Sequence, residues 1–357
     1  MASTLDEIAQ VAAWSLPGGP RRTVQPEDPD RFVAAVTEQR ISGLVAAAAE
    51  NGALASSARE LTEHLRSTHL EALRTSLAVE AASVEVSALL DGAGIRHAML
   101  KGCATAQLDY GDPSLRSTGD VDVLVDRTSY SATLDRLGRA GIHRLAPPFR
   151  TRWEQQYGKD IPLRGAAGVE IDLHLGLVGG YFGVSSDTGS LLDELVEYRL
   201  AGCRLPALDP VGRIVHAAIH SAGGPVIRLG SAADVIVLAR RPAVTPESVA
   251  DRARRLGCEP LVAAGIVRAG QAFGVDLGAL GRWATGVQPT ASEAQALAAL
   301  VHPGGEGVWL SGVQRLPWTR RAGYLAPLLV PSREHLGARG RTLPGHLRTS
   351  IRHLTKR

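Results

Sequence analysis

The chain has 357 residues, of which 45% are hydrophobic and 21% are charged. This composition is that of a folded globular protein and excludes a disordered, collagen-like or disulfide-scaffold protein, and the length allows about two domains. The three cysteines form no Cys-x-x-Cys pair, which excludes that kind of zinc site and favours a reducing compartment. No basic secretory leader and no apolar run of roughly 18 residues are present, so we expect a cytoplasmic protein without a membrane span.

Positive charge is concentrated near the C-terminus. The net charge is +3 at pH 7, but residues 313–357 contain ten Lys and Arg against one acid, Glu334. Apolar residues recur there at helical spacing, which predicts a basic amphipathic tail over 331–357. Such a tail docks on the rest of the protein, on nucleic acid or on an anionic surface. Nucleic acid is not the favoured partner, because no aromatic residues alternate with the arginines.

The first elements are helices. Apolar residues at helical spacing predict helices over 31–99, ended by Gly92 and Gly94. A short strand over 96–100 and a turn at Lys101-Gly102 then lead into a helix from Cys103 to about Tyr110. The remaining expected elements follow in order: a loop over 111–119, a strand over 120–125, a helix capped by Asp126 and closed by Gly141, and a hairpin formed by 161–163 and 169–175.

The second half of the chain is predicted to be helical. Asp209 is a natural N-cap with Pro210 at the first helical position, and 228–300 is rich in Ala and Leu. We therefore expect an α+β protein in which a mixed-sheet core is flanked by helical regions. The expected segments are an N-terminal helical region at 1–94, the core at 95–207, a C-terminal helical domain at 208–330 and the tail at 331–357.

Acidic residues alternate with apolar ones in two of the predicted strands. Asp120 and Asp122 project from one face of the first strand, because residues two apart in a strand share a face. Asp172 and His174 share a face of the second strand with Glu170. If the two strands are neighbours, three aspartates share one small volume, where repulsion calls for a divalent cation or a basic side chain. Mg²⁺ prefers such oxygen ligands together with water and phosphate.

A phosphate site is predicted at the turn upstream of these acids. Lys101 and Gly102 open a helix directly after a strand, where unpaired N–H groups and the helix dipole favour an anion. Gly102 lets the backbone approach that anion closely, and Lys101 adds a point charge.

Several motifs occur in a fixed order along the chain: Leu100-Lys101-Gly102, Tyr110-Gly111-Asp112-Pro113, Arg116, Gly119-Asp120-Val121-Asp122-Val123-Leu124-Val125, Val169-Glu170-Ile171-Asp172-Leu173-His174, Leu208-x-Pro210, His216 and His220, Arg228-Leu229 and Ala233-Asp234. In this combination they resemble the uncharacterised nucleotidyltransferase family of the DNA polymerase β superfamily. One departure is that the turn reads Gly102-Cys103 where wider superfamily members carry Gly-Ser or Gly-Gly. Asp120 also follows Gly102 by 18 residues instead of about ten.

The resemblance implies a polymerase β-like nucleotidyltransferase fold. It implies that Asp120 and Asp122 bind two Mg²⁺ ions and that Asp172 is a third ligand or the general base. Two metal ions would activate the attacking group and stabilise the pyrophosphate leaving group. Arg116 is a candidate for binding the triphosphate.

The expected activity is therefore transfer of NMP from an NTP, whose base is unknown, to an acceptor group with release of pyrophosphate. The acceptor is a small molecule, a natural-product intermediate or a peptide, and an RNA end also remains open. The oligomeric state is not predicted from the sequence.

Three alternatives remain. The fold can serve as a non-catalytic module that binds a nucleotide or a partner. His216 and His220, four residues apart on a predicted helix, suggest a His-centred metal hydrolase with Asp234 as third ligand, or residues of the substrate cleft together with His174. Binding of nucleic acid through the tail predicts a strongly salt-dependent affinity.

Overall fold

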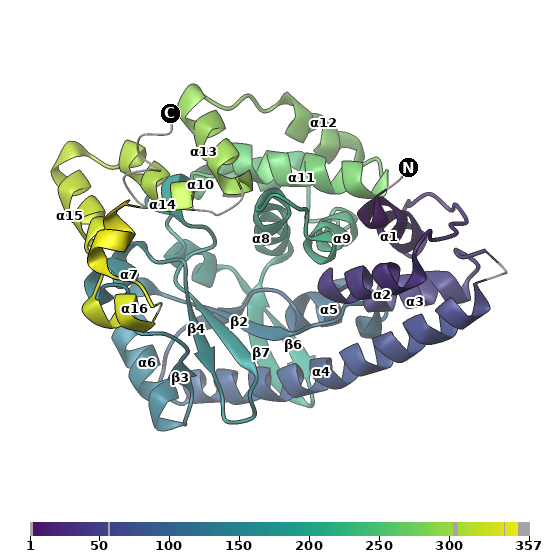
Figure 1. The fold of residues 1–357 in the computed structure, drawn as a ribbon, viewed down its shortest axis with the longest axis horizontal. Coiled ribbons are helices and arrows are strands. Elements are labelled where there is room, and N and C mark those ends of the chain that lie inside the picture. Colours follow the sequence, from purple (N-terminus) through teal and green to yellow (C-terminus); the bar gives the residue numbers. More distant parts are fainter. Residues whose placement is uncertain (1–2, 56–57, 303–305, 339, 349–357) are drawn as a thin grey trace.

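A computed structural model describes residues 3–55, 58–302, 306–338 and 340–348 (Figure 1). A seven-stranded sheet with strand order β3-β4-β5-β2-β1-β7-β6 forms the centre of the molecule. β2 is parallel to β5 and β1 is parallel to β7, whereas the other neighbours are antiparallel. Helices cover both faces of this mixed sheet, which confirms the predicted α+β class. The strands are β1 (His97–Met99), β2 (Asp120–Val125), β3 (His143–Arg144), β4 (Asp160–Arg164), β5 (Glu170–His174), β6 (Leu195–Leu200) and β7 (Cys203–Leu208).

The N-terminal part of the chain is helical, as predicted, and its last helix supports the sheet. This helix, α4, has 33 residues and runs along the lower side of the molecule in Figure 1. Its residues Val79, Val86 and Leu90 are buried against the sheet. The first helix lies within the helical region predicted at 1–94, but it had no predicted bounds, because helical periodicity was recognised only from residue 31 onward. The four helices are α1 (Thr4–Ala13), α2 (Pro29–Glu38), α3 (Ser42–Glu50) and α4 (Arg59–Asp91).

Two faces of the central strand β2 have different roles. Val121, Val123 and Val125 pack into one hydrophobic cluster with α4, whereas Leu124 packs into another with the helices that follow the sheet. Because side chains alternate along a strand, Asp120 and Asp122 lie on the face opposite α4. The acids therefore face the C-terminal helices.

Short helices connect the strands of the core. α5 begins at Cys103 directly after the turn, as predicted, and Asp126 accepts a hydrogen bond from the Thr128 N–H before α6. The helices and 3-10 turns here are α5 (Cys103–Asp109), η1 (Pro113–Leu115), η2 (Arg127–Ser129), α6 (Tyr130–Arg139), α7 (Thr151–Tyr157), η3 (Gly180–Phe182) and η4 (Gly189–Asp193).

The second half of the chain forms a helical layer on the acidic face of the sheet. Asp209 caps the first of these helices by accepting hydrogen bonds from the N–H groups of Val211 and Gly212, and Pro210 occupies its first position, as predicted. The helices are α8 (Pro210–Ala222), α9 (Leu229–Leu238), α10 (Pro246–Arg255), α11 (Glu259–Phe273), α12 (Gly278–Gly286), α13 (Ala291–Val301), α14 (Glu306–Ser311), α15 (Trp318–Leu329) and α16 (Arg333–Ala338), with a 3-10 turn η5 (Gly312–Arg315).

Ion pairs to one buried aspartate, Asp109, join the core to this helical layer. Arg213 of α8 forms a buried bidentate pair with Asp109 of α5, and Arg241 also contacts Asp109. Burial of such charges is costly unless they are paired and hydrogen-bonded, so these contacts fix the helices at a defined position relative to the sheet.

The predicted tail is only partly described. Residues 343–348 are helical, whereas 349–357, which contain the rest of the expected amphipathic pattern, lie outside the described residues. Among the helices that the structure describes, none is both long and apolar enough to cross a membrane.

Candidate metal and nucleotide site

The acidic residues of the two strands are brought together by strand pairing. β2 and β5 are parallel neighbours, and their register places Asp122 beside Asp172 and Asp120 beside Glu170. Directly adjacent residues on one face of a sheet have Cβ atoms only about 5 Å apart. The two strands are therefore neighbours, which was the condition under which we expected their acidic residues to lie close together.

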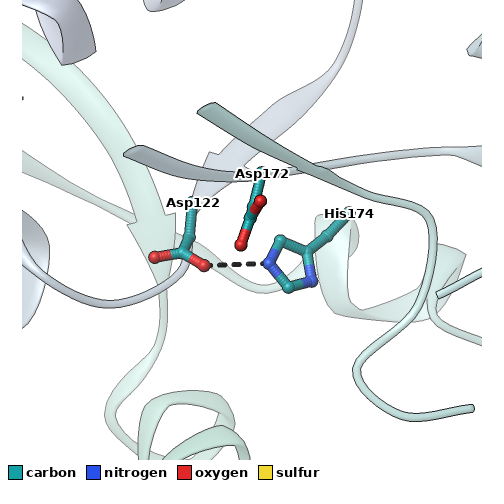
Figure 2. Close-up of side chains that lie close together, drawn as sticks. All are labelled: Asp122, Asp172 and His174. Atoms are coloured by element: carbon teal, nitrogen blue, oxygen red, sulfur yellow. Dashed lines mark hydrogen bonds and ion pairs between the residues drawn. The ribbon is translucent and has the colours of Figure 1, made fainter. Parts of the chain in front are cut away.

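Asp122, Asp172 and His174 form a compact cluster in which each residue offers a ligand atom within 4.8 Å of the other two (Figure 2). His174 Nε2 donates a hydrogen bond to Asp122 Oδ1 at 2.9 Å, and its Nδ1 faces the carbonyl oxygen of Gly176 at 3.3 Å. His174 is fully buried, so these two contacts fix the orientation of the ring.

Asp122 is buried but remains ionised. Burial by itself raises the pKa of this carboxyl group, but the positive charge of Lys101 and the hydrogen bond from His174 outweigh burial and hold the pKa well below its usual range. Lys101 Nζ lies 3.2 Å from Asp122 Oδ1. Both of these partners contact Oδ1, whereas Oδ2 is buried and has no hydrogen-bond partner.

The pKa of Asp172 is shifted in the opposite direction, upward. Burial raises its pKa, and the negative charges of Asp122, Asp160 and Asp120 raise it further, against a smaller opposing effect of His174. The site therefore holds one firmly ionised carboxylate beside a second one whose charge is disfavoured by its neighbours. A bound cation would relieve this repulsion.

These residues fit a divalent metal ion. A buried carboxylate oxygen without a partner is rare in folded proteins and is explained when an ion or a water occupies the adjacent space. Asp122 Oδ2 is such an atom, and Asp172 supplies a second carboxylate close by. Carboxylate oxygens with room for water and phosphate are the ligands that Mg²⁺ prefers, whereas an imidazole also suits zinc or other transition metals.

Asp120, the third predicted acid, lies at the edge of this cluster. Its Oδ1 accepts a hydrogen bond at 2.7 Å from Arg40 Nη1, which belongs to the loop between α2 and α3. Asp120 is less buried than Asp122. In the structure, two of the predicted acids thus lie in the cluster with His174, and the third is paired with an arginine.

The predicted phosphate-binding turn lies beside the acids. Gly102 has φ +62°, which favours glycine, and a Cβ here would lie 3.3 Å from Thr118 Cγ2. Lys101, Gly102 and Asp120 line one cavity of about 390 Å³, together with Arg40 and other residues. The complete lining is Glu38, Gln39, Arg40, Lys101, Gly102, Arg116, Thr118, Asp120, Val226, Ile227, Arg228, Gly230 and Ser231.

Arg116 lines this cavity but already has a carboxylate partner. Its Nε and Nη2 donate to the two oxygens of Asp234 at 2.7 and 2.9 Å, and Tyr110 donates to the same carboxylate at 2.9 Å. All three side chains are buried. Arg116 therefore connects the loop before β2 to α9, and its positive charge at the cavity is compensated by Asp234.

His216 and His220 lie on α8 near the cluster but do not join it. The His216 ring is 5.9 Å from the ring of His174 and 4.6 Å from that of His220, measured between centroids. Burial, together with the nearby charges of His174 and Lys101, lowers the pKa of His216 well below its usual value. Asp234, the third ligand that we considered for a His-centred site, is bound to Arg116 instead.

Some residues of the site were not predicted from the sequence. Lys159 pairs with Asp160 at 2.8 Å, and both contribute to the charge around the acids. The rarity of lysine is a signal that could have identified it, since two of the three lysines of this chain lie at the site. Nothing in the sequence pointed to Arg40, which is 80 residues from Asp120.

Comparison with known protein families confirms the resemblance that the sequence motifs predicted. The model of a family described as uncharacterised nucleotidyltransferase matches residues 25–274. No curated protein matches the chain. Among solved structures, the chain is similar to an antigenic nucleotidyltransferase-like protein from Paracoccidioides brasiliensis, with 15% identity, a TM-score of 0.34 and coverage of 62% of this chain and 96% of that chain. Since the family match spans well over half of the chain, this protein belongs to the uncharacterised nucleotidyltransferase family.

Proposed function

We propose that this protein is a Mg²⁺-dependent nucleotidyltransferase that transfers NMP from an NTP to an acceptor and releases pyrophosphate. The observation that carries the proposal is the pairing of Asp122 with Asp172 across β2 and β5, together with a buried Asp122 oxygen that has no hydrogen-bond partner. A cavity lined by basic side chains adjoins these acids. Membership of the family supports the same reaction class.

In this proposal each residue of the site has a defined task. Asp122 and Asp172 would hold metal, and Asp120 would join them through Oδ2 while its Oδ1 stays paired with Arg40. Bound metal would lower the pKa of the attacking group and stabilise charge on the leaving pyrophosphate. His174 holds Asp122 in place through Oδ1, which leaves Oδ2 without a hydrogen-bond partner in the protein. Lys101 and Gly102 would contact the phosphates.

The acceptor is proposed only as a class. A small molecule, a natural-product intermediate or a peptide would each present a hydroxyl, phosphate or comparable nucleophile to the α-phosphate. The rival His-centred hydrolase loses its third ligand, because Asp234 is held by Arg116 and Tyr110. A non-catalytic nucleotide-binding protein with the same fold is the remaining alternative.

Position of the transferred label tests the reaction. The protein is incubated with Mg²⁺ and with NTPs labelled at the α- or the γ-phosphate, and small-molecule and protein fractions of an extract are offered as acceptors. We expect transfer from the α-labelled nucleotide only, and a loss of about a thousandfold in Asp122→Asn, since a metal contributes several kcal/mol to the transition state.

The matched control is Asp135→Asn. It removes an exposed carboxylate on α6 that does not belong to the cluster, and this variant is expected to transfer label normally. Transfer of the γ-label would show a phosphotransferase. Absence of any transfer would favour the non-catalytic alternative.

A further inference from the structure

Arg40, which lies outside the predicted catalytic core, occupies an unusual backbone position beside the site. It follows helix α2 and has φ +54°, a left-handed conformation that side chains with a Cβ rarely adopt. The N–H groups of Arg40 and Ile41 donate to the carbonyls of Thr37 and Val36, at 3.1 and 3.4 Å. These two bonds form a Schellman motif, in which the left-handed residue is usually glycine.

The rest of the chain follows that preference for glycine. Six other helices of the described residues end with the same pair of hydrogen bonds, and each places glycine in the left-handed position: Gly52, Gly94, Gly141, Gly257, Gly274 and Gly340. Arginine at this position of α2 is therefore a departure from the chain's own pattern. Backbone strain of this kind is typical of functional sites.

The surrounding structure holds the strained turn firmly. The N–H of Leu229 donates to Gln39 Oε1 at 2.9 Å, which attaches the turn to α9. On the other side, the hydroxyls of Ser42 and Ser117 are 2.9 Å apart, which attaches the turn to the loop before β2. Arg40 is thus presented to the site from a fixed backbone position.

The Arg40 side chain lies in the cavity next to the acids. Its Nη1 donates to Asp120 Oδ1 at 2.7 Å, and its Cζ lies 3.0 Å from the position of a Cβ on Gly119. The side chain is 51% exposed, and an ion pair at such an exposed position contributes little to stability. Pairing with Asp120 is therefore a weak reason to keep arginine in a strained turn.

The charge of the cavity indicates what Arg40 binds. Four of its lining residues are basic and two, Glu38 and Asp120, are acidic. The basic residues are Arg40, Lys101, Arg228 and Arg116, of which Arg116 is already compensated by Asp234. A guanidinium has five N–H donors, of which Asp120 takes one, so Arg40 can bind a phosphate while it remains beside the acids.

We propose that Arg40, with Lys101 and Arg228, binds the polyphosphate chain of the nucleotide in this cavity. This inference rests on the proposed function, since it names the part of the substrate that the cavity recognises. Arg40 would be a substrate-binding residue contributed by the N-terminal helical region. It would place the polyphosphate directly beside Asp120.

Glycine at position 40 separates this role from a structural one. Arg40→Gly relieves the strained backbone and removes the guanidinium, so we expect an unchanged or higher Tm and an affinity for inorganic tripolyphosphate with Mg²⁺ that is weaker by about tenfold or more. ATP affinity should fall by the same factor, because the base does not contact Arg40. Isothermal titration calorimetry and thermal unfolding measure these effects, and Arg40→Asn, which also tolerates this backbone, is the second variant.

Two control variants test the separate parts of the change. Ala201 is the other non-glycine residue with positive φ among the described residues, at φ +48°. Ala201→Gly relieves the backbone strain there and should raise the Tm without changing the affinity for tripolyphosphate. Arg31→Gln removes an exposed positive charge from α2 and should leave binding unaffected.

The outcomes distinguish this inference from the function on which it rests. If wild type binds ATP and tripolyphosphate and both variants at position 40 bind them equally well, Arg40 has no role in binding and the inference is wrong, while the proposed function stands. A large decrease in Tm with unchanged affinity would likewise show a structural role. If wild type binds monophosphate as tightly as tripolyphosphate, the site is not specific for polyphosphate. If wild type binds none of these ligands, the proposed function itself fails.

Discussion

Asp122 is the most constrained acid of the site at the scale of single residues. Its Oδ1 contacts His174 and Lys101, its Oδ2 has no partner, and its neighbours keep its pKa low. Period-two alternation in two strands predicted its proximity to Asp172 on the condition that the strands are neighbours, which they are. The pairing of Asp120 with Arg40 could not be predicted, since it depends on how a distant helix packs.

Because His216 is buried, we expect the stability of the protein to depend on pH. The pKa of this histidine is well below its usual value of 6.5, because burial and nearby positive charge disfavour the protonated form. The unfolded chain therefore binds one more proton than the folded protein below about pH 6.5. The free energy of unfolding should decrease as the pH falls through this range, by up to about 1.4 kcal/mol per pH unit from this residue.

His216→Gln removes this contribution. Urea unfolding in EDTA between pH 5 and 8 should show a shallower pH dependence for His216→Gln than for wild type. His64→Gln, which changes an exposed histidine of α4, is the control and should retain the wild-type slope. Equal slopes for wild type and His216→Gln would show that His216 is not kept neutral by the fold.

At the scale of elements, sequence patterns identified the strands and helices with strong periodicity. β2 has the predicted bounds, and the hairpin of β4 and β5 forms as expected. β6 and β7 were missed. Glu197 and Arg199 alternate with apolar residues in β6, a strand signal that was overlooked, and β7 contains Pro206, which disfavours a strand. Both form because β7 pairs with β1 and covers its free edge.

The contact between α8 and α11 depends on one glycine. A Cβ at Gly265 of α11 would lie 1.9 Å from the carbonyl oxygen of Ala218 in α8, so any larger residue separates the two helices. α8 carries His216 and His220 to the site. Gly265→Ala should therefore lower the free energy of unfolding by about 2 kcal/mol or more, as overpacking of a close contact does.

Gly138→Ala provides the matched comparison. Gly138 lies in α6, where a Cβ would meet nothing within 4 Å, and alanine there should raise the stability by up to about 1 kcal/mol. Denaturant unfolding measures both variants. A Gly265→Ala protein as stable as wild type would show that the two helices do not pack as closely as described.

At the scale of the whole molecule, one hydrophobic core contains residues from all three of the large segments expected from the sequence. One continuous hydrophobic cluster contains Ile8 of α1, Leu124 of β2 and Ile236 of α9. We therefore propose that the regions 1–94, 95–207 and 208–330 fold together. Composition and periodicity cannot indicate such packing, because they describe neighbours in sequence and not in space.

This arrangement explains why residues from three segments meet at the cavity. Arg40 comes from the N-terminal helical region, Lys101 and Asp120 from the core, and Arg228 from the N-terminal end of α9 in the helical layer. A site built in this way depends on the position of every layer. The motifs of the sheet could be recognised in the sequence, whereas the basic residues contributed by the other layers required the fold.

The most direct test is nucleotide binding measured by calorimetry with ATP, GTP, CTP and UTP, in Mg²⁺ and in EDTA, because it requires no acceptor. Wild type and Asp135→Asn should bind a nucleotide in Mg²⁺ and bind it much more weakly in EDTA. The double variant Asp120→Asn/Asp122→Asn should lose the metal-dependent part. Absence of binding in wild type, or binding that neither EDTA nor the double variant weakens, would contradict the assignment of these carboxylates as a metal-dependent nucleotide site.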